Sequence, residues 1–120
     1  MRMLVCLAFV IIAVAVPTIV LDHSSTDSEL SIEQARQMMA EQDGDYILLD
    51  VRTLDEFAAG HKYGAILIPH DEIADRFEDE FPDRNALIFV YCRTGRRSAW
   101  AVQMIREMGY EHVHDIGGII

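Results

Sequence analysis

The chain has 120 residues, of which 51% are hydrophobic, and its 20 Asp and Glu outnumber its 10 Lys and Arg, which gives a formal net charge of −10. This length suits one domain with a single modest core. A surface this acidic repels polyanions, so we expect no nucleic-acid partner.

The first residues are predicted to direct export. Arg2 precedes a long uncharged apolar run, and a short basic start before an apolar core is typical of a secretory signal peptide, here over residues 1–21. The apolar stretch 3–21 has 19 residues, close to the ~20 that cross a bilayer, so an uncleaved N-terminal membrane anchor is the alternative. In both cases we expect a protein exported to the periplasm or beyond. The polar segment 22–28 is predicted to be a linker, and the folded domain is expected over 29–120.

Short apolar strands alternate with helices along the expected domain. Capping boxes that begin at Ser31 and Thr53 predict two helix starts, and the brief, almost fully apolar runs are typical of strands buried on both faces. The predicted order is a helix from 32 to 42, a strand over 46–51, a helix over 54–59, a strand over 64–69, a helix over 71–77, a strand over 86–91, a helix over 99–108 and a strand over 111–116.

This alternation predicts an α/β domain with a mostly parallel central sheet and helices on both faces. On the last helix, Trp100 and the methionines at helical spacing are assigned to the core. Active sites of such domains lie at the carboxyl ends of the strands. The residue that follows the third strand, Cys92, is therefore expected at the active edge.

Cys92 is the candidate nucleophile. It lies between the apolar run 86–91 and the helical pattern 99–108, where loop N–H groups and the positive end of the helix dipole favour the thiolate. The thiolate is the form of cysteine that attacks. The other cysteine, Cys6, lies in the export segment, so no disulfide is expected within the mature domain. The alternative for Cys92 is a buried structural cysteine.

The loop after Cys92 is predicted to bind a small anion, because it brings three guanidinium groups together with a glycine that permits a tight turn. Arg93 and Arg97 are expected to contact the anion, and Arg96 is expected to be more exposed. The predicted substrate-binding residues are Arg93, Thr94, Gly95, Arg96, Arg97 and Ser98.

Other polar residues near the expected site are assigned supporting roles. Asp50 and Arg52 flank the end of the first strand and are expected to brace the site, as an ion pair or in a network with Glu56, rather than to act as acid and base. His112 and His114 are expected to share a strand face, but two histidines without a third ligand do not make a metal site. We therefore expect no metal and no cofactor.

Three stretches of the sequence form an ordered set of motifs. They are Leu49-Asp50-Val51-Arg52 with Glu56-Phe57 and Gly60-His61, then Gly64-Ala65-Ile66 with Ile68-Pro69, and last Tyr91-Cys92-Arg93-Thr94-Gly95-Arg96-Arg97-Ser98 with Gly117-Gly118. In order and spacing this set resembles the rhodanese homology domain over nearly all of residues 29–120. An export segment before one small domain is similar to the secreted single-domain rhodaneses of the phage-shock-protein-E kind.

The resemblance implies a two-step sulfur transfer. In the family, the cysteine thiolate attacks the outer sulfur of thiosulfate, releases sulfite and becomes a persulfide, from which cyanide or another thiol removes the sulfur. The expected partners are therefore a small anionic sulfur donor and a cyanide or thiol acceptor. Exchange of this type requires a low-pKa, accessible thiolate.

Loop length favours sulfur over phosphorus chemistry in this resemblance. Members with a six-residue loop handle sulfur, whereas relatives with a seven-residue loop that ends in arginine handle phosphate or arsenate. Here Cys92 to Arg97 is the six-residue loop, and Ser98 stands where a phosphatase needs arginine. A phosphatase or arsenate reductase is thus the lesser alternative, and a partner-dependent sulfur carrier or thiol-sensing module is another. Because the chain ends two residues after Gly118, where relatives usually continue, the sequence leaves open whether the C-terminus is truncated.

Overall fold

The computed structural model describes residues 30–119. The predicted export segment 1–21 and linker 22–28 lie outside the described residues, so both stay predictions. Within residues 30–119, no helix combines the length and apolarity that crossing a membrane requires.

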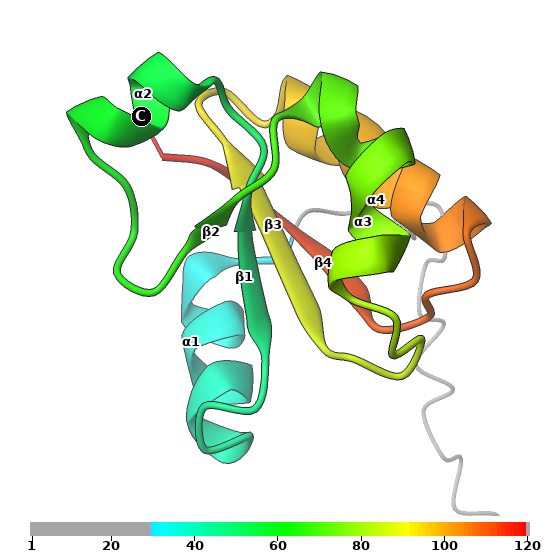
Figure 1. Cartoon of the computed structure of the whole chain (residues 1–120). Helices are drawn as coiled ribbons and strands as arrows, with labels where there is room; N and C mark the ends of the chain where they lie inside the picture. Colours follow the sequence, from blue (N-terminus) through cyan, green and yellow to red (C-terminus); the bar gives the residue numbers. More distant parts are fainter. Residues whose placement is uncertain (1–29, 120) are drawn as a thin grey trace, which may run out of the picture.

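Four strands form one sheet in the order β2-β1-β3-β4, and every neighbouring pair is parallel (Figure 1). Parallel pairing requires a crossover after each strand, and the helices predicted between the strands supply these crossovers. The bounds are Ile47–Asp50 for β1, Ile66–Leu67 for β2, Ile88–Cys92 for β3 and Val113–Gly118 for β4. The prediction of an α/β domain with a mostly parallel sheet is confirmed.

The helices cover both faces of this sheet, also as predicted. In Figure 1, α1 lies on one side of the strands, and α3 and α4 lie together on the other. Both capping boxes form, with Ser31 before α1 and Thr53 before α2. The bounds are Ile32–Glu41 for α1, Leu54–Ala59 for α2, Ile73–Glu80 for α3 and Arg96–Glu107 for α4, and a 3-10 turn, η2, spans His70–Glu72 ahead of α3.

Two apolar clusters, one on each face, hold the layers together. Alternate residues of β3 divide between them, so that Val90 and Cys92 face the cluster with Ile105 of α4, while Phe89 and Tyr91 face the cluster with Ala35 of α1. All five residues of β3 are buried, as expected for a strand that is covered on both faces. Cys92 is therefore anchored at the end of the most enclosed element of the domain.

The last helix begins three residues earlier than the sequence pattern predicted. Gly95 adopts a φ of +94° and serves as the N-cap of α4, so the helix begins at Arg96. The buried face of α4 is consequently set by Ser98, Ala101 and residues one turn further on. Trp100 falls outside this face and is 45% exposed, so its assignment to the core was wrong.

Candidate active site

The sulfur of Cys92 lies inside the turn that joins β3 to α4. The Gly95 backbone N–H donates to Cys92 Sγ over 2.9 Å, and Ser98 Oγ lies 3.5 Å from the same sulfur. Ser98 is fully buried and also donates to the Gly95 carbonyl over 3.0 Å. Because α4 begins at Arg96, these groups belong to the orphan N–H end of a helix, where negative charge is stabilised.

This environment lowers the pKa of the Cys92 thiol. Burial on its own raises that pKa, but hydrogen bonds from the Ser98 side chain and from the backbone N–H groups of Ser98, Gly95 and Thr94 outweigh it. A cysteine that is buried only for packing has no such donors, and its pKa rises. The site therefore shifts the equilibrium of Cys92 toward the thiolate.

The expected accessibility of that thiolate is not found. Cys92 has 0% exposure, because its side chain points into the turn and not toward solvent. Sulfur exchange requires an accessible thiolate, and the resting thiol is held away from solvent by its contacts within the turn.

The end of β4 fixes this turn from the side. A Cβ atom on Gly118 would lie 2.5 Å from the Arg93 carbonyl oxygen and 2.9 Å from Thr94 Cα, a distance that only a glycine allows. The next residue, Ile119, donates its N–H to the carbonyls of both Cys92 and Arg93 over 3.1 Å. The glycine pair noted in the sequence thus has a physical role, which is to let β4 pack directly against the backbone of the loop.

Arg97 forms an ion pair with Glu56, which the sequence analysis assigned to a network with Asp50 and Arg52. Its Nη1 and Nη2 donate to the two oxygens of Glu56 over 2.6 and 2.9 Å, and this bidentate pair lowers the pKa of Glu56 to about 2, chiefly through the Arg97 hydrogen bonds. Glu56 is also the N3 residue of the capping box with Thr53, so it joins α2 to α4. The only sequence signal for this contact was the capping box itself.

Asp50 and Arg52 form the expected ion pair, without Glu56. Arg52 Nη2 lies 2.7 Å from Asp50 Oδ2, and both side chains are buried. Arg52 also donates to the Gly60 carbonyl over 2.7 Å, which holds the end of α2 beside β1. The pair is structural in its geometry, because each charge is satisfied by the other.

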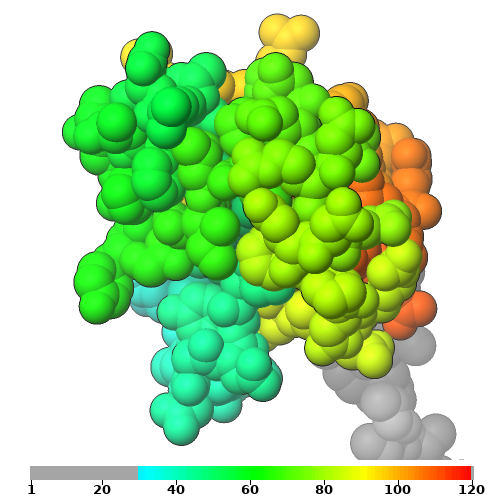
Figure 2. Space-filling model, viewed as in Figure 1, coloured from blue at the N-terminus to red at the C-terminus, as the bar shows by residue number. Residues whose placement is uncertain are grey.

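Of the four arginines near the loop, two are thus neutralised and two are not. Within residues 30–119, Arg93 and Arg96 form no ion pair, and both are exposed together with Thr94. In Figure 2 the yellow atoms of the β3–α4 connection stand at the upper edge, above the green residues of α2 and α3. The positive charge available to an anion therefore lies on Arg93 and Arg96.

A pocket of about 470 Å³ opens beside the start of α4. Trp100 and His70 meet edge to face in its wall, with ring centroids 6.1 Å apart, and Nδ1 of His70 is buried without a hydrogen-bond partner among the described residues. The pocket is lined by His70, Asp71, Arg96, Arg97 and Trp100. Sequence reasoning missed it, because His70 and Trp100 come from separate elements with no shared motif.

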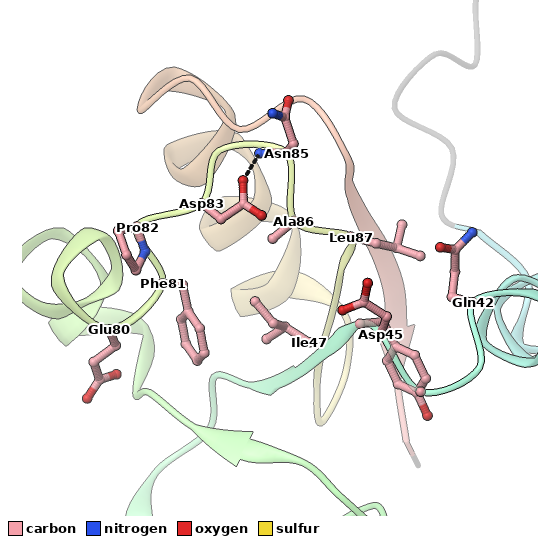
Figure 3. A pocket seen from close by; sticks show the side chains of 12 residues that line it. Gln42, Asp45, Ile47, Glu80, Phe81, Pro82, Asp83, Asn85, Ala86 and Leu87 are labelled. Carbon is pink, nitrogen blue, oxygen red and sulfur yellow. Dashed lines mark hydrogen bonds between the residues drawn. The ribbon is translucent and has the colours of Figure 1, made fainter.

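A second pocket of about 400 Å³ lies at the opposite edge of the sheet, where β1 and β3 begin. Figure 3 shows the carboxylates of Asp45, Glu80 and Asp83 around it, with Asp83 accepting from the Asn85 N–H over 2.9 Å. Within the described residues, no group of three or more His, Cys, Asp or Glu side chains is arranged to hold a metal ion. None of the residues that line this acidic pocket is a cysteine or a serine.

Comparison with known proteins places these features in a family. The model of the rhodanese-like domain family matches residues 31–119. The thiosulfate sulfurtransferase PspE of Escherichia coli (strain K12) is 41% identical over 71 residues, which are 59% of this chain and 68% of that relative. Among solved structures, a rhodanese with anions from E. coli has a TM-score of 0.59 and 39% identity, and the match covers 62% of this chain and 87% of that one.

A further relative differs in its described role. The putative sulfur carrier protein YrkF of Bacillus subtilis (strain 168) is 28% identical over 95 residues, which are 79% of this chain and 50% of that relative. The chain thus spans about half of that protein's length. The resemblance noted in the sequence is confirmed, and the relatives include both a sulfurtransferase and a putative carrier.

Proposed function

The chain belongs to the rhodanese-like domain family, and from this membership we propose that it moves sulfur from thiosulfate or a persulfide donor to cyanide or a thiol, through a persulfide on Cys92. Sulfur transfer is supported at the level of the family by the sulfurtransferases among its relatives. The proposal adds the donor, the acceptor and the residue that carries the sulfur.

In the first step, the Cys92 thiolate attacks the outer sulfur of thiosulfate. A bond forms between Sγ and that sulfur, the sulfur–sulfur bond of thiosulfate breaks, and sulfite leaves with the bonding pair. One negative charge on the enzyme and two on thiosulfate become one on the persulfide and two on sulfite. The step needs no cofactor, because the thiolate is already favoured by the hydrogen bonds from Gly95 and Ser98.

In this scheme the other residues of the loop bind and orient the donor. Arg93 and Arg96, which form no ion pair with another described residue, attract the dianion, and the backbone N–H groups of Thr94 and Gly95 stabilise charge on the reacting sulfur atoms. Arg97 acts through its pair with Glu56, which fixes the first turn of α4 against α2. Asp50 and Arg52 hold the neighbouring strand end.

The observation that carries the proposal is the surroundings of Cys92 Sγ, which accepts a hydrogen bond from the Gly95 N–H and contacts the Ser98 hydroxyl. A phosphatase of similar loop would need an arginine where Ser98 stands, and here Ser98 is buried and directed at the sulfur. The similarity to a putative sulfur carrier favours one second candidate, a module that loads sulfur on Cys92 and releases it only to a partner. Either role suits an exported protein, as the N-terminal segment predicts.

The test is sulfite release from thiosulfate with cyanide as acceptor, measured on the full chain. We expect turnover in the wild type and a loss of at least about 10³-fold in Cys92→Ser. Cys6→Ser is the matched control, because it removes the only other cysteine, and it should keep full activity.

Mass spectrometry after thiosulfate treatment separates the two candidates. A wild type that gains one sulfur on Cys92 but releases none to cyanide is a carrier. A folded wild type that neither loads sulfur nor releases sulfite contradicts both roles, and retained activity in Cys92→Ser contradicts the assignment of the nucleophile.

A further inference from the structure

The pocket between η2 and the first turn of α4 is distinct from the turn that holds the sulfur. It is lined by the imidazole of His70, the indole of Trp100, the carboxylate of Asp71 and the first two residues of α4. Trp100 is 45% exposed, although burying an indole is strongly favourable. An aromatic wall left open beside the loop provides a surface for the apolar body of a ligand.

The charges around this pocket suit a ligand with a single negative charge. Arg97 is neutralised by Glu56, which leaves Arg96 as the unpaired cation of the lining within residues 30–119. The exposed carboxylate of Asp71 lines the same pocket. Asp71 repels a second negative charge, so a dianion such as thiosulfate is better placed on the Arg93 side of the loop.

The pocket adjoins the residues that contact the sulfur. Arg96 directly follows Gly95 and Arg97 directly precedes Ser98, and these two neighbours are the ones that lie against Cys92 Sγ. Once Cys92 is loaded, the transferable sulfur lies one disulfide-type bond, ~2 Å, beyond Sγ. Loading therefore moves the reactive atom away from the fully buried position of Sγ.

We propose that this pocket is the acceptor subsite and that it selects a small thiol that carries one carboxylate, with the carboxylate beside Arg96 and the aliphatic body against Trp100. The inference rests on the proposed sulfur transfer. The acceptor sulfur attacks the outer sulfur of the persulfide, a new sulfur–sulfur bond forms, and the bond to Sγ breaks. The acceptor leaves as its persulfide anion, and the proton of its thiol passes to Cys92, so no oxidant or reductant is needed.

The test compares three small thiols of similar length as acceptors with the full chain. The probes are 3-mercaptopropionate, which is anionic, 2-mercaptoethanol, which is neutral, and cysteamine, which is cationic. With thiosulfate at saturating concentration, so that loading by the donor does not limit turnover, we expect Arg96→Gln to raise the KM for 3-mercaptopropionate about tenfold, as for loss of one charge-assisted hydrogen bond, and not to raise the KM for cysteamine. For Trp100→Ala we expect the KM to rise for all three thiols. Ratios of variant to wild type cancel the intrinsic reactivity of each thiol.

The donor step provides the internal control. The burst of sulfite that accompanies loading should stay within about twofold in Trp100→Ala, because the indole contacts no donor group in this scheme. Arg36→Gln, on the exposed surface of α1, is the matched control for net charge and should leave every acceptor KM unchanged. An equal effect of Arg96→Gln on all three thiols, or an unchanged KM in Trp100→Ala, overturns the subsite. Absence of the sulfite burst in the wild type would instead contradict the proposed function itself.

Discussion

The two edges of the sheet carry pockets of similar size and different charge. The pocket at the carboxyl edge, about 470 Å³, is lined by Arg96 and Arg97 together with Asp71. The pocket at the amino edge, about 400 Å³, is lined by carboxylates, among them Asp45 and Glu80. Volume does not distinguish them, so size is a poor guide to the site in this molecule.

What distinguishes the edges is the direction of the chain. In a parallel sheet all strands end at one edge, and the helices that follow them begin there, with unpaired N–H groups directed at that edge. Cys92, at the end of β3, meets such a helix start. The amino edge receives helix C-termini such as the end of α3 at Glu80, where a thiolate would find no donors.

The largest expected effect on stability comes from comparing two glycine-to-alanine variants, one at each edge of the sheet. At Gly118 a Cβ would overlap the Arg93 carbonyl at 2.5 Å, so Gly118→Ala should cost about 3 kcal/mol of stability by overpacking and should displace the loop. At Gly44, which lines the acidic pocket, φ is +83° but no atom lies within 4 Å. Gly44→Ala should therefore cost only its backbone strain, about 1 kcal/mol. Urea unfolding measures both.

The rate of sulfite release provides a second comparison of Gly118→Ala with Gly44→Ala. Sulfite release should fall in Gly118→Ala even at temperatures where the variant is fully folded, and it should be unchanged in folded Gly44→Ala. Equal losses of stability at the two glycines would show that β4 does not press on the loop as the distances indicate.

A smaller effect is expected from removing one donor at the carboxyl edge. Ser98→Ala deletes the side-chain hydrogen bond that lowers the pKa of Cys92, so that pKa should rise and the thiolate fraction at neutral pH should fall. We expect sulfite release at pH 7 to drop about tenfold and its acid limb to move to higher pH. The rate of alkylation by iodoacetamide as a function of pH reports the thiol directly.

Ser31→Ala is the matched control for that substitution. Ser31 caps α1, so its loss should cost about 1 kcal/mol of stability while the titration of Cys92 is unchanged. A shift of the acid limb in both variants would mean that it reports stability and not the thiol.

The sequence was sufficient for the fold and for the position of Cys92 in it, because these depend on local patterns. Capping boxes and short apolar strands predicted the alternation, and the strand–loop–helix order placed Cys92 at the carboxyl edge. The partner of Arg97 could not be predicted, because Glu56 is 41 residues away in the chain and pairing at that separation depends on tertiary packing. The burial of Cys92 and the exposure of Trp100 depended on where the φ of Gly95 starts α4, which residue spacing alone does not fix.

The smallest expected effect tests whether a carboxylate at the carboxyl edge contributes more to the stability of the domain than one at the amino edge. Glu56→Gln removes the pair with Arg97 and should cost about 1 kcal/mol at neutral pH, whereas Asp45→Asn, at the acidic pocket, should stay within about 0.5 kcal/mol. The pKa of Glu56 is lowered from 4.5 to about 2, so its contribution is complete above pH 4.5 and is lost as the pH falls toward 2. In urea unfolding at a series of pH values, the gap between wild type and Glu56→Gln should therefore close over that interval. A gap that stays constant down to pH 2 would mean that the ion pair contributes nothing and that Glu56 acts only as the capping residue of α2.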